Sequence, residues 1–435
     1  MAIFTLANLK KAYRYGRKNG FLPAFYAAVE RTFYQKERYE KRILQPEERR
    51  AQEETLWEHR EMFSILVPAY DTQIGHFHEM IDSVLRQTYP VFELIIADAS
   101  PSDKLKEELK YYKDSRIIYK KLAKNRGISE NTNEALQWAK GSYICLLDHD
   151  DVLEADALYR MMEAIERERK QSRRLPWILY SDEDKGDGEM SLFYEPHRKM
   201  KFNLDLLLSN NYICHFLVMK AELMKELGFR KEFDGAQDHD LVLRAVGRLG
   251  LSGEGIIHVP CVLYHWRCHT RSTALNPQSK MYAYEAGRRA VEDFCRQQGW
   301  KAEVIHTRHL GYFRVAYEGE ILQQRSDLAA VGGSFLTRGR IAGGAYTEEG
   351  EILYRGLPKQ FSGYMHRAIL QQDVFAVDIR HIQVREELIP LLKDIEKKEK
   401  DVAAASLMFG REAAARGYRI LWDPVIKIMR QTSSR

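Results

Sequence analysis

The 435-residue sequence contains no apolar run of the roughly 20 residues that a membrane-spanning helix needs. Its first residues also lack the compact apolar core and small-residue cleavage site of a signal peptide. Cysteine is scarce, because the five cysteines are an odd number, lie far apart and form no C-x-x-C motif. This pattern is typical of free thiols in a reducing compartment. We therefore expect a cytoplasmic protein.

Glycine-rich phosphate-binding motifs are absent as well. The sequence holds neither a P-loop nor a G-x-G-x-x-G turn. A nucleotide bound by this chain must therefore have its phosphates neutralised by a metal ion and by basic side chains. The net charge of only +5 argues against a nucleic-acid partner. With 45% hydrophobic and 30% charged residues, the composition is that of a globular protein.

Positive charge is concentrated at the beginning of the chain. Residues 1–50 contain twelve basic residues against five acidic ones, with aromatic and aliphatic residues between the charges. We expect residues 1–60 to form a basic helical extension. Two interpretations of it remain open: a solvated helical arm, or a surface that rests on anionic lipid at the inner face of the cell membrane.

Beyond residue 60, short apolar runs alternate with helical patterns of about 10–15 residues. The predicted strands cover residues 63–70, 92–100, 116–122 and 142–151. This alternation predicts an α/β fold with right-handed crossovers and a mostly parallel sheet. Such sheets bind ligands beyond the carboxyl ends of their strands. The stretches "AYD", "ADAS" and "DHDD", which follow three of these strands, should therefore meet in one crevice.

The "DHDD" stretch is a candidate metal site. In an extended strand, Asp148 and Asp150 point to one face while His149 and Asp151 point to the other. Two carboxylates on one face suit Mg²⁺ or Mn²⁺ shared with phosphate oxygens. We expect Asp151 to cap the helix that follows.

A second acidic stretch, "FDGAQDHDLVLR", places Asp234, Asp238 and Asp240 ahead of an amphipathic helix. One carboxylate is enough to cap a helix, so three exceed that need. A carboxylate beside a metal-bound electrophile can act as a general base. We therefore expect a catalytic residue here.

Basic and hydroxyl side chains gather farther along, in "YHWRCHTRSTA". Arginine offers forked donors to phosphate, and imidazole can ligate a metal ion. The combination is typical of a diphosphate-binding site. Its members are His265, Arg267, His269, Arg271, Ser272 and Thr273.

Together these motifs resemble those of the inverting, nucleotide-sugar-dependent glycosyltransferases of family 2, which have the GT-A fold. The resemblance runs from about Phe63 to Thr273 and includes "SILVPAYD", "LIIADAS", "NRGISENTNEALQWAKGSYICLLDHDD" and "YSDEDK". It implies a GT-A catalytic domain over residues 61–310, with a Rossmann-like sheet flanked by helices. Residues 311–435 resemble the back half of a second such domain without its D-x-D motif or base, and are expected to be a vestigial α/β accessory domain.

The resemblance also implies roles for single residues. Asp98 would pair with the nucleobase, Asp150 and His265 would bind the metal ion, and Asp238 would deprotonate the acceptor. The other donor-binding residues would be Pro68, Tyr70, Asp71, Asn125, Gly127, Asn133, Asp148, His149, Arg267, His269 and Ser272. Gln237 and the carboxylates Asp182, Glu183 and Asp184 would face the acceptor, unless the last three form a charged loop.

The function implied is metal-dependent transfer of a sugar, with inversion, from a UDP- or dTDP-sugar. The acceptor would be a glycan or lipid-linked glycan in cell-surface polysaccharide synthesis. Self-association through the accessory domain is a further expectation. Two alternatives stay open: a nucleotide-sugar-binding pseudoenzyme that scaffolds an assembly complex, and a metal-dependent phosphohydrolase that attacks the diphosphate.

Overall fold

The structure, a computed structural model, describes residues 16–17, 20–34, 39–268 and 281–426. The chain divides into two compact units. The large unit comprises Tyr39–Phe202 and Asn211–Phe294, and the small unit comprises Met1–Arg38, Asn203–Asn210 and Cys295–Arg435. The divisions at residues 38 and 294 differ from the predicted boundaries at residues 60 and 310, and the insertion at 203–210 had no sequence signal.

The large unit is built on one mixed sheet, which has nine strands within the described residues. The strand order is β3-β2-β1-β4-β8-β6-β9-β5, with β7 paired to β6. The first four strands are parallel, and β8 runs antiparallel to both of its neighbours. The strands are β1 (Phe63–Ala69), β2 (Phe92–Asp98), β3 (Ile117–Lys121), β4 (Tyr143–Leu146), β5 (Val152–Leu153), β6 (Ile178–Gly186), β7 (Phe193–His197), β8 (Leu217–Lys220) and β9 (Ile256–Arg267).

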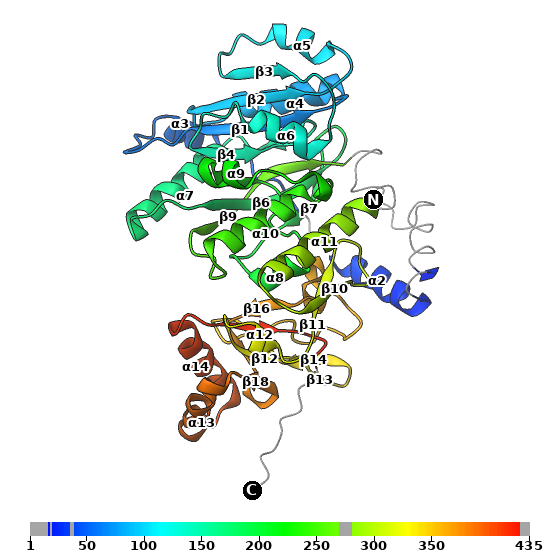
Figure 1. Ribbon diagram of the computed structural model, residues 1–435, viewed down its shortest axis with the longest axis vertical. Helices are drawn as coiled ribbons and strands as arrows, with labels where there is room; N and C mark the ends of the chain where they lie inside the picture. Colours follow the sequence, from blue (N-terminus) through cyan, green and yellow to red (C-terminus); the bar gives the residue numbers. More distant parts are fainter. Residues whose placement is uncertain (1–15, 18–19, 35–38, 269–280, 427–435) are drawn as a thin grey trace. The chain divides into compact units, whose positions relative to one another are not determined.

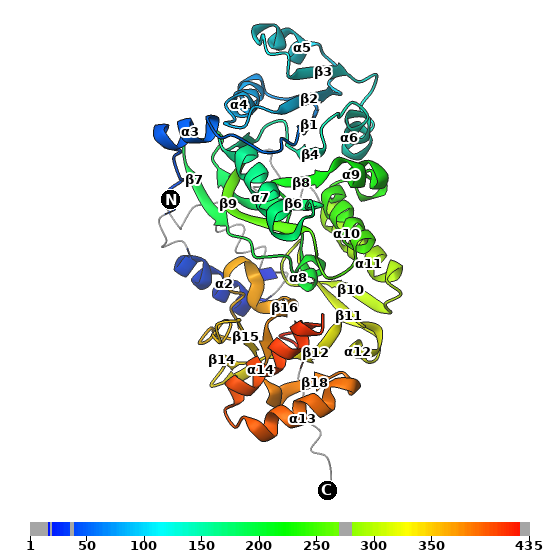
Figure 2. The same ribbon diagram turned by 90° about the vertical axis from the view of Figure 1, so that its left-hand side faces the viewer.

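Helices cover both faces of this sheet, and this explains why β1 and β2 are apolar along almost their whole length. Figure 2 shows α4 and α7 on one side of the strands and α6, α9 and α10 on the other. The helices are α3 (Pro46–Glu53), α4 (Ile74–Leu85), α5 (Lys104–Glu108), α6 (Ile128–Leu136), α7 (Ala157–Ser172), α9 (Ala221–Leu227), α10 (Gln237–Leu249) and α11 (Met281–Gln297). The predicted α/β fold, with its sheet flanked by helices, is confirmed.

The fourth predicted strand is shorter than expected. β4 ends at Leu146, and residues 149–150 form a turn before β5. The alternation of side chains that was predicted for residues 148–151 therefore does not apply. Helix α7 begins only at Ala157, so Asp151 does not cap it.

The small unit combines a four-stranded sheet with three short strand pairs (Figure 1). The sheet has the order β16 (Gln372–Val374), β19 (Arg419–Trp422), β12 (Leu328–Gly332) and β18 (Ile382–Val384). The pairs are β10 (Ala302–His306) with β11 (Phe313–Tyr317), β13 (Phe335–Thr337) with β14 (Arg340–Gly343), and β15 (Ala345–Tyr346) with β17 (Ala376–Val377). Its helices are α2 (Phe21–Tyr34), α8 (Leu204–Ser209), α12 (Ile321–Gln324), α13 (Ile389–Lys398) and α14 (Val402–Ala415).

Helix α8 lies between β7 and β8 in the sequence, yet it belongs to the small unit because of a buried charge network. The side chain of Arg325 is fully buried and forms forked hydrogen bonds to the carboxylates of Asp205, in α8, and Asp327. Although burial raises it, the pKa of Asp205 is held at about 2 by the Arg325 guanidinium. Buried charges persist only when they are paired in this way, so the network fastens α8 in place.

Candidate functional site

The polar stretches that follow β1, β2 and β4 lie at one edge of the sheet, because these strands are parallel neighbours. Side-chain contacts join the three stretches directly. The backbone N–H of Asp71 donates to Ser100 Oγ at 2.9 Å, and Thr72 Oγ1 lies 3.0 Å from His149 Nδ1. Pro68 and Tyr70 stand at the same edge, where β1 ends.

Asp98, at the end of β2, is completely buried and fully hydrogen-bonded. Its Oδ1 accepts from the Ser100 N–H at 2.8 Å. Its Oδ2 accepts from the Tyr119 hydroxyl at 2.7 Å and from Lys121 Nζ at 3.0 Å. Sequence analysis missed Tyr119 and Lys121, although their i, i+2 spacing places them on one face of β3.

The loop before α6 requires its glycine. Gly127 has a φ of +100°, and a Cβ there would come within 2.4 Å of Asp234 Oδ2. Asn125 Oδ1 accepts from the Gly127 N–H at 3.0 Å, and Asp234 Oδ1 accepts from the Ser129 N–H at 3.2 Å. Asp234 therefore satisfies the amino end of α6, which is a structural role.

Asn133 is held differently from Asn125. Its amide nitrogen donates to the carbonyl of Phe229 at 2.7 Å, and its oxygen accepts from the N–H of the same residue at 2.8 Å. The structure therefore gives Asn133 a part in fastening two segments of the large unit together, rather than the predicted contact with the donor.

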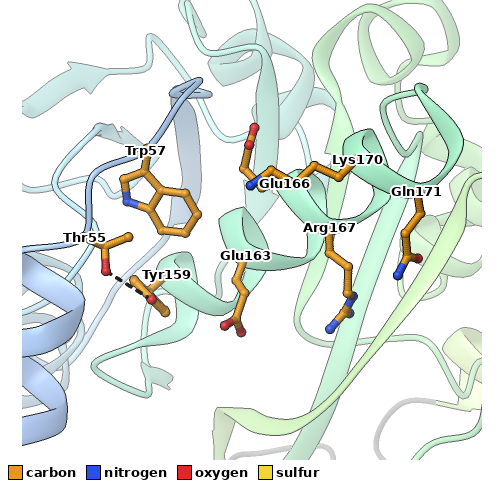
Figure 3. A pocket seen from close by; sticks show the side chains of 8 residues that line it. All are labelled: Thr55, Trp57, Tyr159, Glu163, Glu166, Arg167, Lys170 and Gln171. Atoms are coloured by element: carbon orange, nitrogen blue, oxygen red, sulfur yellow. Dashed lines mark hydrogen bonds between the residues drawn. The ribbon is translucent and has the colours of Figure 1, made fainter.

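Of two surface hollows in the large unit, one is lined by a predicted site residue and the other is not. One, of about 480 Å³, is lined by Lys124, Asn125, Arg126, Glu130 and Lys231 and so includes a predicted donor-binding residue. The other, of about 430 Å³, follows α7 and is drawn in Figure 3. Trp57 and Tyr159 stand at one end of it, and none of the predicted site residues lines it.

The carboxylates after β4 take three different positions. Asp151 is buried, and accepts from the Tyr264 hydroxyl at 2.6 Å and from the Arg267 N–H at 2.7 Å. Asp148 and Asp150 are half-buried. Burial raises the pKa of Asp148 above its ordinary value against the opposing effect of His215, and the nearby Asp150 carboxylate adds to the rise.

His265 was predicted to bind a metal ion, but the structure gives it another role. Its Nδ1 lies 2.6 Å from Asp184 Oδ1 and its Nε2 lies 3.2 Å from Glu154 Oε2, so both ring nitrogens are engaged by carboxylates. Although burial lowers it, the pKa of His265 is raised by these two hydrogen bonds. The two carboxylates therefore favour the protonated form of the ring over the neutral form that would ligate a metal ion.

Arg267, predicted to bind the diphosphate, is also used internally. Its side chain is fully buried, and it donates to the backbone oxygens of Asp150 and Gly188, each at 2.6 Å, and to the Glu79 carboxylate. It therefore fixes the loop that carries Asp150 instead of reaching a ligand. His269 and Ser272 lie outside the described residues.

The acidic stretch Asp182–Asp184 lies in β6 and is buried, so the alternative of a charged loop is wrong. Each carboxylate has a basic partner. His258 Nε2 lies 2.7 Å from Asp182 Oδ1, and Lys199 Nζ lies 3.6 Å from Glu183 Oε2. Although burial raises it, the pKa of Glu183 is held at about 2, chiefly by Lys199.

Two groups of three metal-ligating side chains come together among the described residues. Glu183, Cys214 and His215 come close together, but Lys199 already supplies the positive charge that balances Glu183. The second group, Glu58, His59 and Glu166, belongs to the α7 side of the unit. Asp150 is in neither group.

The three carboxylates around the start of α10 also separate into different roles. Asp240 is buried and paired with Arg230 and Arg244. Asp238, half-buried in the first turn of the helix, accepts from Asn211 Nδ2 at 2.7 Å. Gln237, beside it, accepts from the Gly235 N–H at 2.8 Å and so shapes the turn. Of Asp234, Asp238 and Asp240, Asp238 is thus the carboxylate that is bound neither to an arginine nor to the amino end of a helix among the described residues.

Comparison with known proteins finds a family match within the large unit. The sequence model of glycosyl transferase family 2 matches residues 64–228, the segment that contains β1, β2 and β4. Residues 64–228 are thus similar to the domain that defines glycosyl transferase family 2.

Two named relatives are similar to parts of this chain. The O-antigen biosynthesis protein RfbC of Myxococcus xanthus is 31% identical over 265 residues, which cover 59% of this chain and 20% of that protein. The Escherichia coli enzyme WfaP, a UDP-Glc:α-D-GlcNAc-diphosphoundecaprenol β-1,3-glucosyltransferase, is 35% identical over 109 residues, which cover 25% of this chain and 43% of that protein. The chain thus spans less than half the length of either relative.

A solved structure of Staphylococcus aureus TarS, residues 1–349 in complex with UDP-GlcNAc, aligns with this chain at a TM-score of 0.43 and 18% identity. The alignment covers 55% of this chain and 66% of that one.

The raised pKa of the buried His265 predicts that the stability of the fold depends on pH. Because the pKa of folded His265 lies above the ordinary 6.5, its pairing with Asp184 and Glu154 stabilises the fold fully below about pH 6.5. This contribution is lost as the pH rises through the raised pKa. In urea unfolding between pH 6 and 9, the wild type should lose up to about 1.4 kcal/mol per pH unit from this group.

The His265→Gln variant should be less stable at pH 6 and should lack this part of the slope. His59→Gln, at a more exposed histidine of the same unit, is the matched control and should keep it. Equal slopes for the wild type and His265→Gln would show that the imidazole is neutral in the folded protein.

Proposed function

We propose that the chain transfers a sugar from a nucleoside-diphosphate donor to a glycan hydroxyl, with inversion, in the synthesis of a cell-surface polysaccharide. The observation that carries this proposal is the gathering of Asp98, Asp148 and Asp150 at one edge of the sheet within a family 2 domain. Asp238 belongs to the same neighbourhood, because its charge also raises the pKa of Asp148. The names of RfbC and WfaP, both of glycan synthesis, support the same class of reaction.

The donor would lie across the ends of β1, β2 and β4. The exposed Tyr70 ring, Pro68 and Asp71 would border the nucleoside, with the fixed carboxylate of Asp98 accepting from its base. The named donor of WfaP is UDP-Glc, which supports the uridine member of the expected UDP- or dTDP-sugar pair. Asn125, Gly127 and His149 lie in loops on the same side of the strands.

The oxygens of Asp150 and Asp148 are hard ligands, so these residues fit Mg²⁺ or Mn²⁺ completed by the donor's phosphates. When bound, such an ion supplies charge neutralisation for the leaving diphosphate. Arg267 keeps Asp150 in place for this role through its bond to the Asp150 carbonyl.

Asp238 is proposed as the general base. As the acceptor oxygen attacks the anomeric carbon, Asp238 takes its proton, and the bond to the diphosphate breaks with its electron pair leaving on the diphosphate oxygen. One displacement from the opposite face inverts the anomeric centre. Gln237 would line the acceptor side, while Asp182, Glu183 and Asp184, already paired, would shape the wall behind it.

The decisive variant is Asp238→Asn. It keeps the size of the side chain but removes the proton acceptor, so transfer should fall by about 10²–10⁴-fold while the binding of UDP is unchanged. The measurement is sugar transfer to a lipid-linked glycan beside a UDP titration, with the exposed Glu232→Gln as control. Undiminished glycan synthesis by Asp238→Asn in cells would favour the scaffold, and release of sugar phosphate without acceptor would favour the phosphohydrolase.

The small unit is proposed to be non-catalytic, and it carries a candidate contact with the membrane. Phe21, Leu22 and Phe25 of α2 are 76%, 62% and 62% exposed. The other side of the helix is anchored within the unit, where Glu30 accepts from the backbone N–H groups of Ser362 and Gly363. No helix within the described ranges is long and apolar enough to cross a bilayer, so this contact would be peripheral.

Replacing Phe21, Leu22 and Phe25 together by serine should abolish sedimentation with vesicles that contain anionic lipid. The basic first 50 residues favour such lipid, so wild-type binding should weaken as salt is raised. Leu56→Ser, at a side chain that is 91% exposed in the large unit, is the matched control and should bind like the wild type. Equal sedimentation of all three proteins would remove α2 from the membrane contact.

A further inference from the structure

The segment between α8 and β8 contacts the proposed base through one amide. Asn211 Nδ2 donates to Asp238 Oδ2 at 2.7 Å. The Asn211 oxygen accepts from the Cys214 N–H at 3.3 Å. Because that N–H can only donate, the amide must present its NH₂ group to Asp238.

This segment is itself held from behind by a buried lysine. The side chain of Lys199 is fully buried and donates to the backbone carbonyls of Ile213 and His215, at 2.6 Å for Ile213. Glu183, in β6, lies 3.6 Å away and balances the charge of this lysine. The amide of Asn211 therefore approaches Asp238 from a fixed support rather than from a loose loop.

The two oxygens of Asp238 differ in their hydrogen bonds. Oδ2 accepts from Asn211 and lies 3.6 Å from Cys214 Sγ. Oδ1 accepts no hydrogen bond from any other described residue. One oxygen is thus used to fix the rotamer of the carboxylate, and the other remains for a proton from outside.

We propose that Asn211 is a positioning residue, which orients Asp238 so that Oδ1 faces the acceptor hydroxyl. This proposal rests on the proposed role of Asp238 as the base. A base that is misplaced by about 1 Å can lose about 10²-fold in rate, so the orientation of the carboxylate matters as much as its charge. The donor site at β1, β2 and β4 does not depend on this amide.

The first test is Asn211→Leu, which keeps the approximate size and removes the donor. Its kcat for sugar transfer should fall by about 10- to 100-fold, while the Kd for UDP stays within about twofold of the wild type. The acid limb of its pH–rate profile should move to higher pH, because a hydrogen bond that favours the carboxylate is lost.

The second variant, Asn211→Asp, places a like charge against Asp238. Its acid limb should move up by about one pH unit or more, so that part of its activity returns at alkaline pH. Asn210→Leu is the matched control, because Asn210 is the adjacent buried asparagine and its side-chain oxygen has no hydrogen-bond partner among the described residues. It should keep the wild-type rate and profile.

The outcomes separate this inference from the proposed function. If Asp238→Asn abolishes transfer but both Asn211 variants keep the wild-type rate and pH profile, the positioning role is wrong and the base assignment stands. If Asp238→Asn transfers sugar normally, the base assignment itself is wrong. An Asn211 variant can also lose rate without a shift of its pH–rate profile. If its thermal unfolding temperature is lowered as well, the role of Asn211 is purely structural.

Discussion

The crowding of carboxylates after β4 is the constraint on which the rest of the site depends. Three aspartates within four residues repel one another unless each finds a separate environment. The structure buries Asp151 against the Tyr264 hydroxyl and the N–H of Arg267, and it ties the carbonyl of Asp150 to the Arg267 guanidinium. Asp148 and Asp150 lie half-buried at the edge of the sheet.

Charge pairing also explains why two residues that were predicted to bind ligands, His265 and Arg267, are used within the protein. A charged side chain inside a protein must be paired, since leaving it unpaired costs several kcal/mol or more. His265 pairs with Asp184 and Glu154, Lys199 pairs with Glu183, and Arg267 reaches Glu79. These pairs form the scaffold around the site, and they leave Asp238 with one oxygen that no other described residue engages.

Sequence periodicity was enough to predict the parallel part of the sheet, because β1, β2 and β4 are apolar runs that end in polar residues. It also placed Asp98 correctly at the end of its strand, whereas Asp150 lies in the turn that follows β4. It could not show that residues 149–150 turn, because a turn after a strand is decided by contacts with β9, more than a hundred residues away. For the same reason it could not tell the paired His265 and Arg267 from ligand-binding residues.

The division of the chain into two units could not be predicted from local sequence pattern either. Helix α8 looks like part of the catalytic segment, and only the distant Arg325 assigns it to the small unit. Asn211, the first residue after that insertion, carried no signal of its own. Its contact with Asp238 joins residues 27 positions apart in the sequence. Roles of this kind depend on tertiary pairing, which a single sequence does not display.

The central claim is that the edge formed by β1, β2 and β4 binds a nucleoside diphosphate together with a divalent ion. The most direct measurement is an equilibrium titration of UDP and dTDP, with and without Mn²⁺, on the wild type and on Asp150→Asn. The account predicts that Mn²⁺ tightens binding to the wild type by about tenfold or more, equivalent to about 1.4 kcal/mol, and has little effect on Asp150→Asn. Failure of both nucleotides to bind, or equal tightening by Mn²⁺ in the two proteins, would contradict it.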